Sequence, residues 1–204
     1  MTIRLHRGDL PDLSRYTGAV AIDTETMGLQ PVRDRLCVVQ LSPGDGSADV
    51  VQLGHEIGPA PNLKALLADA SKTKIFHFAR FDIAILYKAL GVMAQPVYCT
   101  KIASKLTRTY TDKHGLKDLV KDMLGKDVSK QQQLTDWGAE QLTEAQVAYA
   151  ADDVLYLHAL KAKLDAMLAR ENREELAAAC FRFLPARARL DLLGWAEQDI
   201  FAHS

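Results

Sequence analysis

The sequence predicts an α/β fold in which helices flank a mixed central sheet. Three apolar runs of strand length follow one another closely, which is typical of an antiparallel meander; they cover residues 19–25, 35–41 and 49–53. A fourth run, 74–78, lies between two helical patterns, as strands of α/β sheets do. From about residue 100 onward the apolar pattern is mostly helical.

Each element has a local signal. Residues 3–6 are a candidate short strand, and the strand at 35–41 ends at the turn sequence SPGDGS. The helix predicted at 61–70 begins with Pro61 and carries three leucines on one face. A further helix is predicted over 81–90 and ends at Gly91, and a short strand is predicted just before residue 100. A loop covers 126–137. Two long helical regions follow, over 143–170 and about 173–198.

The composition is that of an ordinary globular protein, with 48 % hydrophobic and 25 % charged residues among 204. We expect a single domain over 1–204, in which about 173–204 form a helical tail and a candidate oligomer contact. The net charge of −1 differs from the strongly basic balance of proteins that track long nucleic acid. An anionic partner would therefore have to be small, gripped locally, or held through an added cation.

The cysteines Cys37, Cys99 and Cys180 are far apart and have no CxxC spacing. This pattern argues against a disulfide framework or a zinc site and fits the reducing cytoplasm. The N-terminus lacks the apolar core of a signal peptide, and no stretch approaches the roughly 18 apolar residues of a membrane helix. We therefore expect a cytoplasmic protein without a membrane partner.

Two acids end the first apolar strand, in the stretch AIDTETMGL. Side chains alternate along a strand, so Asp23 and Glu25 leave from the same face. Like charges at the edge of a core destabilise a fold unless something compensates them. Ligands of open α/β sheets bind at the carboxyl ends of strands, and the segment after His77 reaches such an end as well. Asp82 follows it; taken alone, Asp82 is an ordinary acid at a helix start.

A late helix carries a further acid and a phenol. At about 100° per residue, Tyr149 and Asp153 border the buried side together, whereas Asp152 points toward solvent. The simpler interpretation is a surface helix with a partly covered Asp153 bonded to a neighbouring donor. Four carboxylates near one sheet edge would repel, and hard divalent cations with oxygen ligands resolve that repulsion. Two such ions can activate water and stabilise a leaving oxygen at phosphorus.

The order of these residues resembles a known superfamily. Asp23-Thr24-Glu25, Phe81-Asp82 and the pair Tyr149 and Asp153 resemble the three motifs of the DEDD 3′–5′ exonucleases, and the tyrosine marks the DEDDy branch. The linking segments resemble ribonuclease D-like proteins; they are HGLKDL at 114–119, SKQQQLTDW at 129–137 and YAADDVLYL at 149–157. The resemblance covers about residues 19–165 and implies a ribonuclease H-like exonuclease fold with a helical C-terminal extension.

The resemblance also implies roles for single residues. Four acids would hold two Mg²⁺ ions, for which Mn²⁺ can substitute; they are Asp23, Glu25, Asp82 and Asp153. Tyr149 would orient the attacking water, and the products would be nucleoside 5′-monophosphates. The catalytic set implied by the resemblance is Asp23, Glu25, Asp82, Tyr149 and Asp153.

Two departures from ribonuclease D concern the substrate. Ribonuclease D carries further helical domains after its catalytic domain, and only 51 residues follow Asp153 here. After Trp137, ribonuclease D usually continues with Arg-Pro-Leu, whereas this chain has Gly138-Ala139-Glu140. The short form, with RTYTDKHGLKDL and GWAEQDIFAHS, is most similar to the nanoRNase C family. Those bacterial DEDDy enzymes degrade very short RNAs, including dinucleotides, and assemble into octamers.

The resemblance thus implies a homo-oligomer that acts on the 3′ ends of short RNA or of DNA. One alternative is a general 3′–5′ exonuclease on longer RNA or DNA. Another is a non-catalytic nucleic-acid-binding module, which the presence of all four acids argues against.

Candidate substrate contacts surround the acids, and each has a structural alternative. Gly28 allows close backbone approach, and Leu29 is either a wedge against terminal bases or a buried side chain. Thr24 points to the opposite face of its strand, as a structural residue would. Lys105 and Arg108 lie in the basic stretch 101–121, which is either a phosphate contact or a solvated face or subunit contact. The candidates are Thr24, Met27, Gly28, Leu29, His77, Phe81, Lys105 and Arg108.

The tail contains many apolar residues between Phe181 and Phe201, and this surface has to be covered. Packing back on the domain is the default expectation, and a subunit interface is the alternative.

Overall fold

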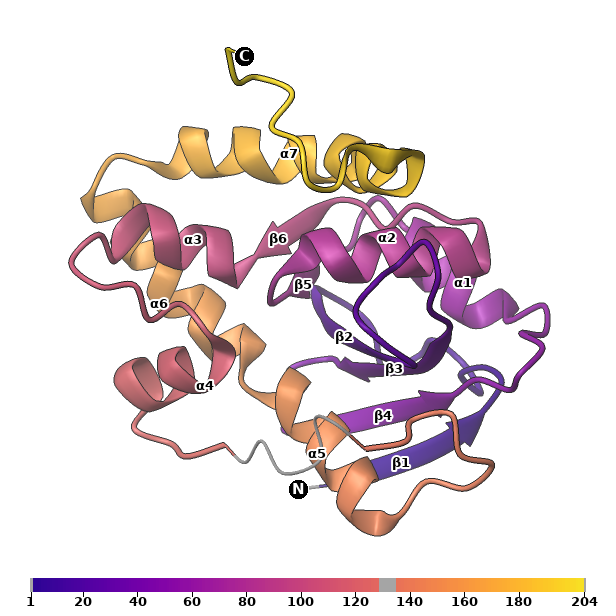
Figure 1. Ribbon diagram of the computed structural model, residues 1–204. Helices are drawn as coiled ribbons and strands as arrows, with labels where there is room; N and C mark the ends of the chain where they lie inside the picture. The colour runs from indigo at the N-terminus through magenta and orange to yellow at the C-terminus, as the bar shows by residue number, and fades with distance from the viewer. Residues whose placement is uncertain (1, 129–134, 204) are drawn as a thin grey trace.

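A six-stranded sheet forms the centre of the computed structural model, which describes residues 2–128 and 135–203 (Figure 1). The strands lie in the order β1-β4-β3-β2-β5-β6. Their bounds are β1 Thr2–Arg7, β2 Val20–Thr26, β3 Leu36–Ser42, β4 Ser47–Gln52, β5 Lys74–Phe76 and β6 Val97–Cys99.

The strand directions confirm the predicted mixed sheet. β2, β3 and β4 form the expected antiparallel meander, because β3 runs antiparallel to both of its neighbours. β1 pairs parallel with β4, and β5 pairs parallel with both β2 and β6. β2 therefore lies inside the sheet, and its carboxyl end shares one edge with the carboxyl end of β5.

Helices cover both faces of the sheet (Figure 1). One apolar core joins the sheet to α1, α2 and part of α7, and a second joins the opposite face to α3, α5 and α6. The helices are α1 Pro61–Ala68, α2 Ala79–Leu90, α3 Thr100–Thr107, α4 Leu116–Leu119, α5 Glu144–Leu155, α6 Leu157–Arg170 and α7 Glu174–Leu190, with π-helical turns η1 Val120–Leu124 and η2 Asp191–Trp195.

Alternation along β2 decides which face each side chain serves. Val20 and Ile22 belong to the core under α1 and α2, whereas Ala21 belongs to the core under α5 and α6. By the same alternation, Asp23 and Glu25 face α5, and Thr24 faces α2.

Two helices differ from their predicted extent. α2 begins at Ala79, earlier than predicted, because Phe78 takes a left-handed conformation at φ 65° and starts the helix there. The region expected as one helix at 143–170 is two helices, α5 and α6, which meet at Tyr156. No glycine or proline marks this break, so the apolar pattern runs through it unchanged.

Part of one predicted segment lies outside the described residues. The expected loop 126–137 includes 129–134, and so does the SKQQQLTDW motif. Of that motif, Thr135 to Trp137 are described.

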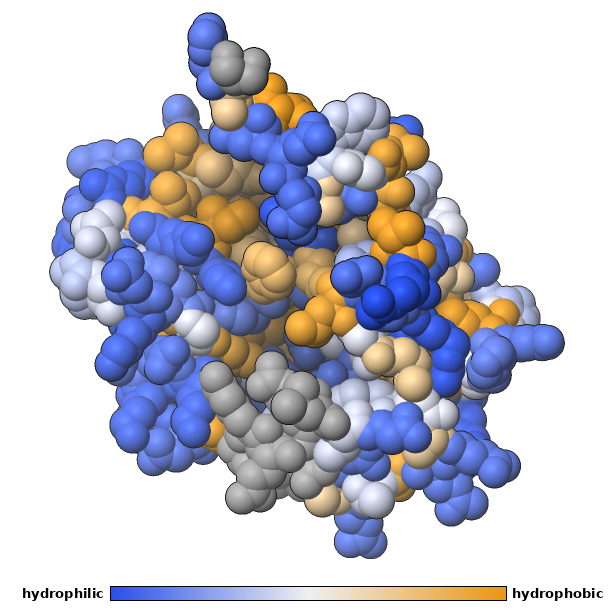
Figure 2. Space-filling model, in the orientation of Figure 1, coloured by the Kyte–Doolittle hydropathy of each residue, from blue (hydrophilic) through white to orange (hydrophobic). Residues whose placement is uncertain are grey.

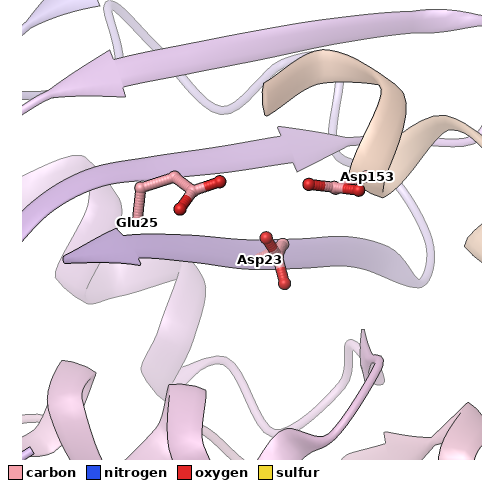
Figure 3. Close-up of side chains that lie close together, drawn as sticks. All are labelled: Asp23, Glu25 and Asp153. Atoms are coloured by element: carbon pink, nitrogen blue, oxygen red, sulfur yellow. The ribbon is translucent and has the colours of Figure 1, made fainter. Parts of the chain in front are cut away.

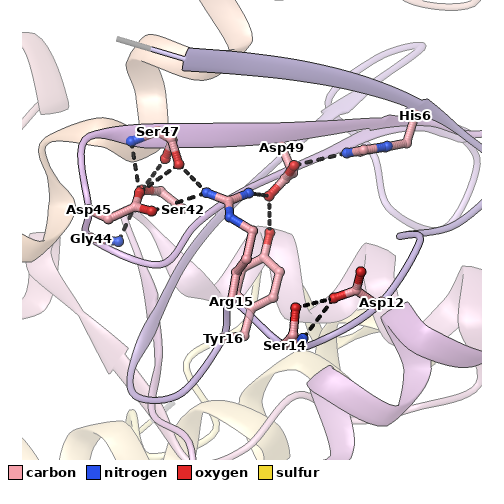
Figure 4. Close-up of polar contacts among 10 residues, drawn as sticks. All are labelled: His6, Asp12, Ser14, Arg15, Tyr16, Ser42, Gly44, Asp45, Ser47 and Asp49. Atoms are coloured by element: carbon pink, nitrogen blue, oxygen red, sulfur yellow. Dashed lines mark hydrogen bonds and ion pairs between the residues drawn. The ribbon is translucent and has the colours of Figure 1, made fainter.

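A polar network fastens the N-terminal segment to β4 (Figure 4). Asp49 is 3 % exposed and accepts hydrogen bonds from His6 on β1 at 2.8 Å and from Tyr16 at 2.7 Å. Arg15 also donates to Asp49. This buried carboxylate therefore has its partners inside the chain.

Among the described residues, no helix has both the length and the apolar character needed to cross a membrane.

Candidate active site

Three carboxyl groups meet between β2 and α5. Asp23 and Glu25 project from β2, and Asp153 projects from the second half of α5 (Figure 3). One oxygen from each group lies within 4.8 Å of the other two. All three side chains are half-buried. The sheet and the helix thus bring together acids that are up to 130 residues apart in the sequence.

Asp82 approaches from the other face of β2. It lies in the first turn of α2, is 3 % exposed, and accepts a hydrogen bond from Thr24 Oγ1 at 2.7 Å. Thr24 therefore has the structural contact that its strand position predicts. Asp82 is not part of the close group of three carboxyls found among the described residues. It is nevertheless close enough that its charge raises the pKa of Asp23.

Burial and mutual repulsion raise the pKa values of these four acids. Burial is the main cause that raises the pKa of Glu25 to about 9, and the charges of Asp153 and Asp82 add to it. Burial likewise raises the pKa values of Asp82 and Asp153 to about 7. The pKa of Asp23 is raised as well, first by burial and then by the charges of the neighbouring acids.

The donor set fits a divalent cation. Within the described chain, no lysine or arginine forms an ion pair with any of the four acids. The side chains that donate hydrogen bonds to them are neutral; they are Gln40 for Asp23, Thr24 for Asp82 and Tyr149 for Asp153. Several carboxylate oxygens without a cationic side chain are the ligands that Mg²⁺ and Mn²⁺ prefer.

Tyr149 lies one turn before Asp153 on the same side of α5. Its half-buried ring lies beside the indole of Trp137, with ring centroids 6.0 Å apart. Burial, and then the charges of Asp153 and Glu25, raise the pKa of Tyr149. The phenol therefore keeps its proton at neutral pH and can donate a hydrogen bond at this site.

The helical wheel places Asp152 on the solvent side of its helix. It is half-buried rather than directed freely to solvent, and burial raises its pKa. The wheel assumes one straight helix on a flat surface, whereas α5 ends three residues later and α6 takes a new direction. Asp152 lies outside the close carboxyl group formed by the described residues.

A cleft of about 570 Å³ opens at the acids. All five predicted catalytic residues line it, and six of the eight substrate candidates do so as well; the six are Thr24, Met27, Gly28, Leu29, His77 and Phe81. The space-filling view shows a hollow on this face with apolar side chains inside it and hydrophilic ones around it (Figure 2).

The predicted substrate contacts that line the cleft differ in their exposure and in their contacts with the protein. Leu29 is 83 % exposed, which contradicts the alternative of a buried side chain. A Cβ at Gly28 would collide with the Asp34 carboxylate, so the close approach there is to the protein itself. His77 Nδ1 lies 2.9 Å from Thr100 Oγ1, and burial lowers the pKa of His77 to about 3, so its ring is neutral.

The structure contradicts the expectation for Arg108. Its side chain is 2 % exposed, and its guanidinium donates to the Lys113 carbonyl at 2.8 Å and to Asp122 at 2.6 Å. A guanidinium held in this way is not free to meet a phosphate. Lys105 is exposed but does not line the cleft.

Nine residues that line the cleft were not among the predicted site residues; they are Thr26, Phe78, Lys101, Gly115, Leu116, Lys117, Val128, Thr135 and Trp137. Lys101 and Lys117 belong to the same basic stretch as Lys105, but nothing in their spacing shows which lysines face the cleft. The Lys101 ammonium lies 4.4 Å from the centroid of the Phe78 ring, an aromatic that is 46 % exposed.

Gln40 was missed too. It lies opposite Asp23 in the β2–β3 pairing, and its Nε2 donates to Asp23 Oδ2 at 2.8 Å. The available signal was a polar amide inside the apolar run at 35–41.

Comparison with known proteins decides the family. A family described as 3′–5′ exonuclease matches residues 10–169, which is most of the chain. The chain belongs to the 3′–5′ exonuclease family. This exonuclease is similar over its whole length to NrnC of Brucella melitensis. The structure of NrnC with bound Mg²⁺ matches at 62 % identity and a TM-score of 0.96, and the structure bound to pGG matches at 63 % and 0.97, each over 100 % of both chains.

The exonuclease is also similar to larger proteins. Ribonuclease D of Acidiphilium cryptum is 35 % identical over 159 residues, which are 78 % of this chain and 40 % of the relative. The structure of Escherichia coli RNase D matches with 29 % identity and a TM-score of 0.77, over 86 % of this chain and 46 % of that one. The chain thus spans less than half the length of these relatives, and the likeness confirms the predicted ribonuclease D-like exonuclease fold.

Proposed function

We propose that this exonuclease hydrolyses short RNA oligonucleotides, including dinucleotides, from their 3′ ends to nucleoside 5′-monophosphates. The observation that carries the proposal is the acid-lined cleft, which is about 570 Å³ and contains the close group of Asp23, Glu25 and Asp153. Support for a short substrate comes from NrnC, which is similar over its whole length and has been solved with pGG, a dinucleotide.

Four acids would hold the metal in this proposal; they are Asp23, Glu25, Asp82 and Asp153. We propose two Mg²⁺ ions per site, with Mn²⁺ as a substitute. When bound, such ions lower the pKa of water and stabilise the leaving 3′ oxygen. The chain itself supplies the rest: Tyr149 holds a proton and orients the attacking water, and Thr24 keeps Asp82 in place through its hydrogen bond.

The substrate would lie along the apolar wall of the cleft. Leu29, which is 83 % exposed, serves as a wedge against the terminal bases, and Met27 and Phe81 extend the same wall. His77 offers a neutral ring there. In place of Lys105 and Arg108, the cationic cleft residues Lys101 and Lys117 face the phosphates.

We propose a cytoplasmic homo-oligomer, and an octamer by resemblance to nanoRNase C. The single exonuclease domain would contribute its tail to the subunit contact. This assignment rests on the large apolar side chains that the tail leaves exposed; they are Leu176, Phe183, Leu193, Trp195, Ile200 and Phe201.

The test compares pGG, a long single-stranded RNA and a duplex DNA under the same Mg²⁺ concentration. We expect pGG to be hydrolysed fastest to monophosphates and EDTA to abolish the reaction. Faster hydrolysis of the long RNA or of the DNA would favour a general 3′–5′ exonuclease. Binding that is insensitive to EDTA, without hydrolysis, would favour a non-catalytic module.

A further inference from the structure

Gln40 lies buried beside the acids. It is a β3 residue with 0 % exposure, paired across the sheet with Asp23. Its Nε2 donates to Asp23 Oδ2 at 2.8 Å. Its Oε1 is also buried, and no donor to that oxygen is found in the described chain.

Packing alone does not explain this amide. Every residue of β3 is buried, and an apolar side chain of similar length would fill the same space without leaving a buried oxygen unpaired. A buried polar atom without a partner is destabilising. Among the described residues, Asp23 is the only hydrogen-bond partner of the Gln40 side chain, so the amide serves that contact.

The contact fixes how the carboxyl group of Asp23 is turned. A carboxylate only accepts hydrogen bonds, so the nitrogen of the amide has to face it. With one lone pair of Oδ2 engaged by Gln40, the group cannot rotate freely about its bond to Cβ. The remaining lone pairs are left for a cation near Glu25 and Asp153. Partners of this kind orient metal ligands in proteins.

We propose that Gln40 is a positioning residue, which sets the orientation in which the Asp23 carboxylate meets a divalent cation. Gln40 touches neither the cation nor the substrate. The inference rests on the proposed function, because it takes Asp23 to be a metal ligand.

The test is Gln40→Met, which keeps the length of the side chain and removes the donor. Mn²⁺ binding is measured by calorimetry on the full chain, and activity is measured against Mg²⁺ concentration. We expect Mn²⁺ affinity to fall about tenfold or more. The Mg²⁺ concentration for half-maximal activity should rise in parallel, with kcat largely recovered at saturation.

A matched control is Gln52→Met. Gln52 is another buried glutamine, 7 % exposed, whose Nε2 donates to the Ala139 carbonyl at 2.9 Å and not to the acids. Loss of this amide should lower stability and leave Mn²⁺ affinity unchanged. The control separates a general effect of removing a buried amide from an effect on the metal site.

Wild-type Mn²⁺ affinity in Gln40→Met would overturn the proposal, whatever its stability. If that variant does not fold, Gln40→Asn gives the same measurement, because its shorter amide keeps the polarity but does not reach Asp23. Failure of the unmodified protein to bind Mn²⁺ would refute the proposed function instead, so the two failures are distinguishable.

Discussion

The carboxyl groups of Asp23, Glu25 and Asp153 are close enough to oppose one another's ionisation, and their pKa values are raised in the folded chain. This arrangement is expected of a site in which a bound cation, rather than a basic side chain, compensates the negative charges. At the scale of single residues, each acid can therefore be tested by removing its charge or by supplying the cation.

Asp153→Asn removes one proposed metal ligand while keeping the shape of the side chain. We expect hydrolysis of pGG to slow by at least about 1,000-fold, since metal-assisted charge stabilisation supplies several kcal/mol of the barrier reduction. Steady-state rates at saturating Mg²⁺ measure this. Asp152→Asn is the matched control and should retain most activity. An inactive Asp152→Asn beside an active Asp153→Asn would reverse the two assignments.

Stability without cations should fall as pH rises. The raised pKa values mean that the folded chain binds more protons than the unfolded chain, from about pH 4 upward. The stabilisation is complete at the acidic end, and it is lost as pH passes about 7 for Asp82 and Asp153 and about 9 for Glu25. Added Mg²⁺ should therefore raise the melting temperature more at about pH 8.5 than at about pH 5.5. Equal Mg²⁺ shifts at both pH values would contradict this.

The sequence revealed the acids because each stands at a recognisable place, at a strand end, a helix start or one turn after a tyrosine. It did not reveal Gln40, because the strand pairing that sets this amide opposite Asp23 is a long-range property. Arg108 shows the converse limit: a basic residue in a basic stretch was expected at a phosphate, but its folded partner is Asp122.

At the scale of elements, α5 carries the half of the site that is remote in sequence from β2. Its N-terminus is fixed by a reciprocal cap between Thr143 and Gln146. Thr143 Oγ1 accepts a hydrogen bond from the backbone N–H of Gln146 at 3.2 Å, and Gln146 Oε1 accepts one from the backbone N–H of Thr143 at 3.0 Å. Such a cap orients the helix start and satisfies two backbone donors.

Thr143→Ala should lower the free energy of unfolding by about 1 kcal/mol, because it removes one side of this cap. Chemical denaturation measures the loss. Thr143→Ser keeps the hydroxyl and should restore most of it. Since Tyr149 and Asp153 lie beyond the first turn, kcat should change little; a large fall in kcat at unchanged stability would show that the cap acts on the site directly.

The elements themselves were predicted well where an apolar period or a glycine marks them, as at the meander and at Gly91. The break between α5 and α6 and the early start of α2 were not predicted. Both depend on backbone conformations, at Tyr156 and Phe78, that neither residue type signals in a sequence.

At the scale of the whole molecule, the tail is packed on the domain in its first part and exposes apolar side chains in its last part. Leu184 and Ala188 of α7 are buried against the core, as in the default expectation of packing back. Beyond them, Trp195 is 42 % exposed and Phe201 is 75 % exposed. Ion pairs attach the start of η2 to the domain, because Arg80 on α2 and Arg187 on α7 both pair with Asp191.

Replacing Trp195 and Phe201 together by Asp should reduce the apparent mass in gel filtration, if the exposed part of the tail forms the proposed subunit contact. Charges in an apolar interface are costly to bury. Leu5→Asp is the control, because Leu5 on β1 is similarly exposed at 44 % but lies outside the tail. An unchanged elution volume for the double variant at low protein concentration would place the contact elsewhere.

The interior position of β2 has a consequence for the order in which the molecule opens. Asp23 and Glu25 belong to a strand with hydrogen-bonded neighbours on both sides, whereas Asp153 belongs to a helix that is attached by packing. Amide hydrogen exchange should therefore be slowest in β2 and faster in α5. A divalent cation bound by acids of both β2 and α5 would link the strand to the helix. Removing the cation should therefore speed amide hydrogen exchange in α5 and leave β2 protected.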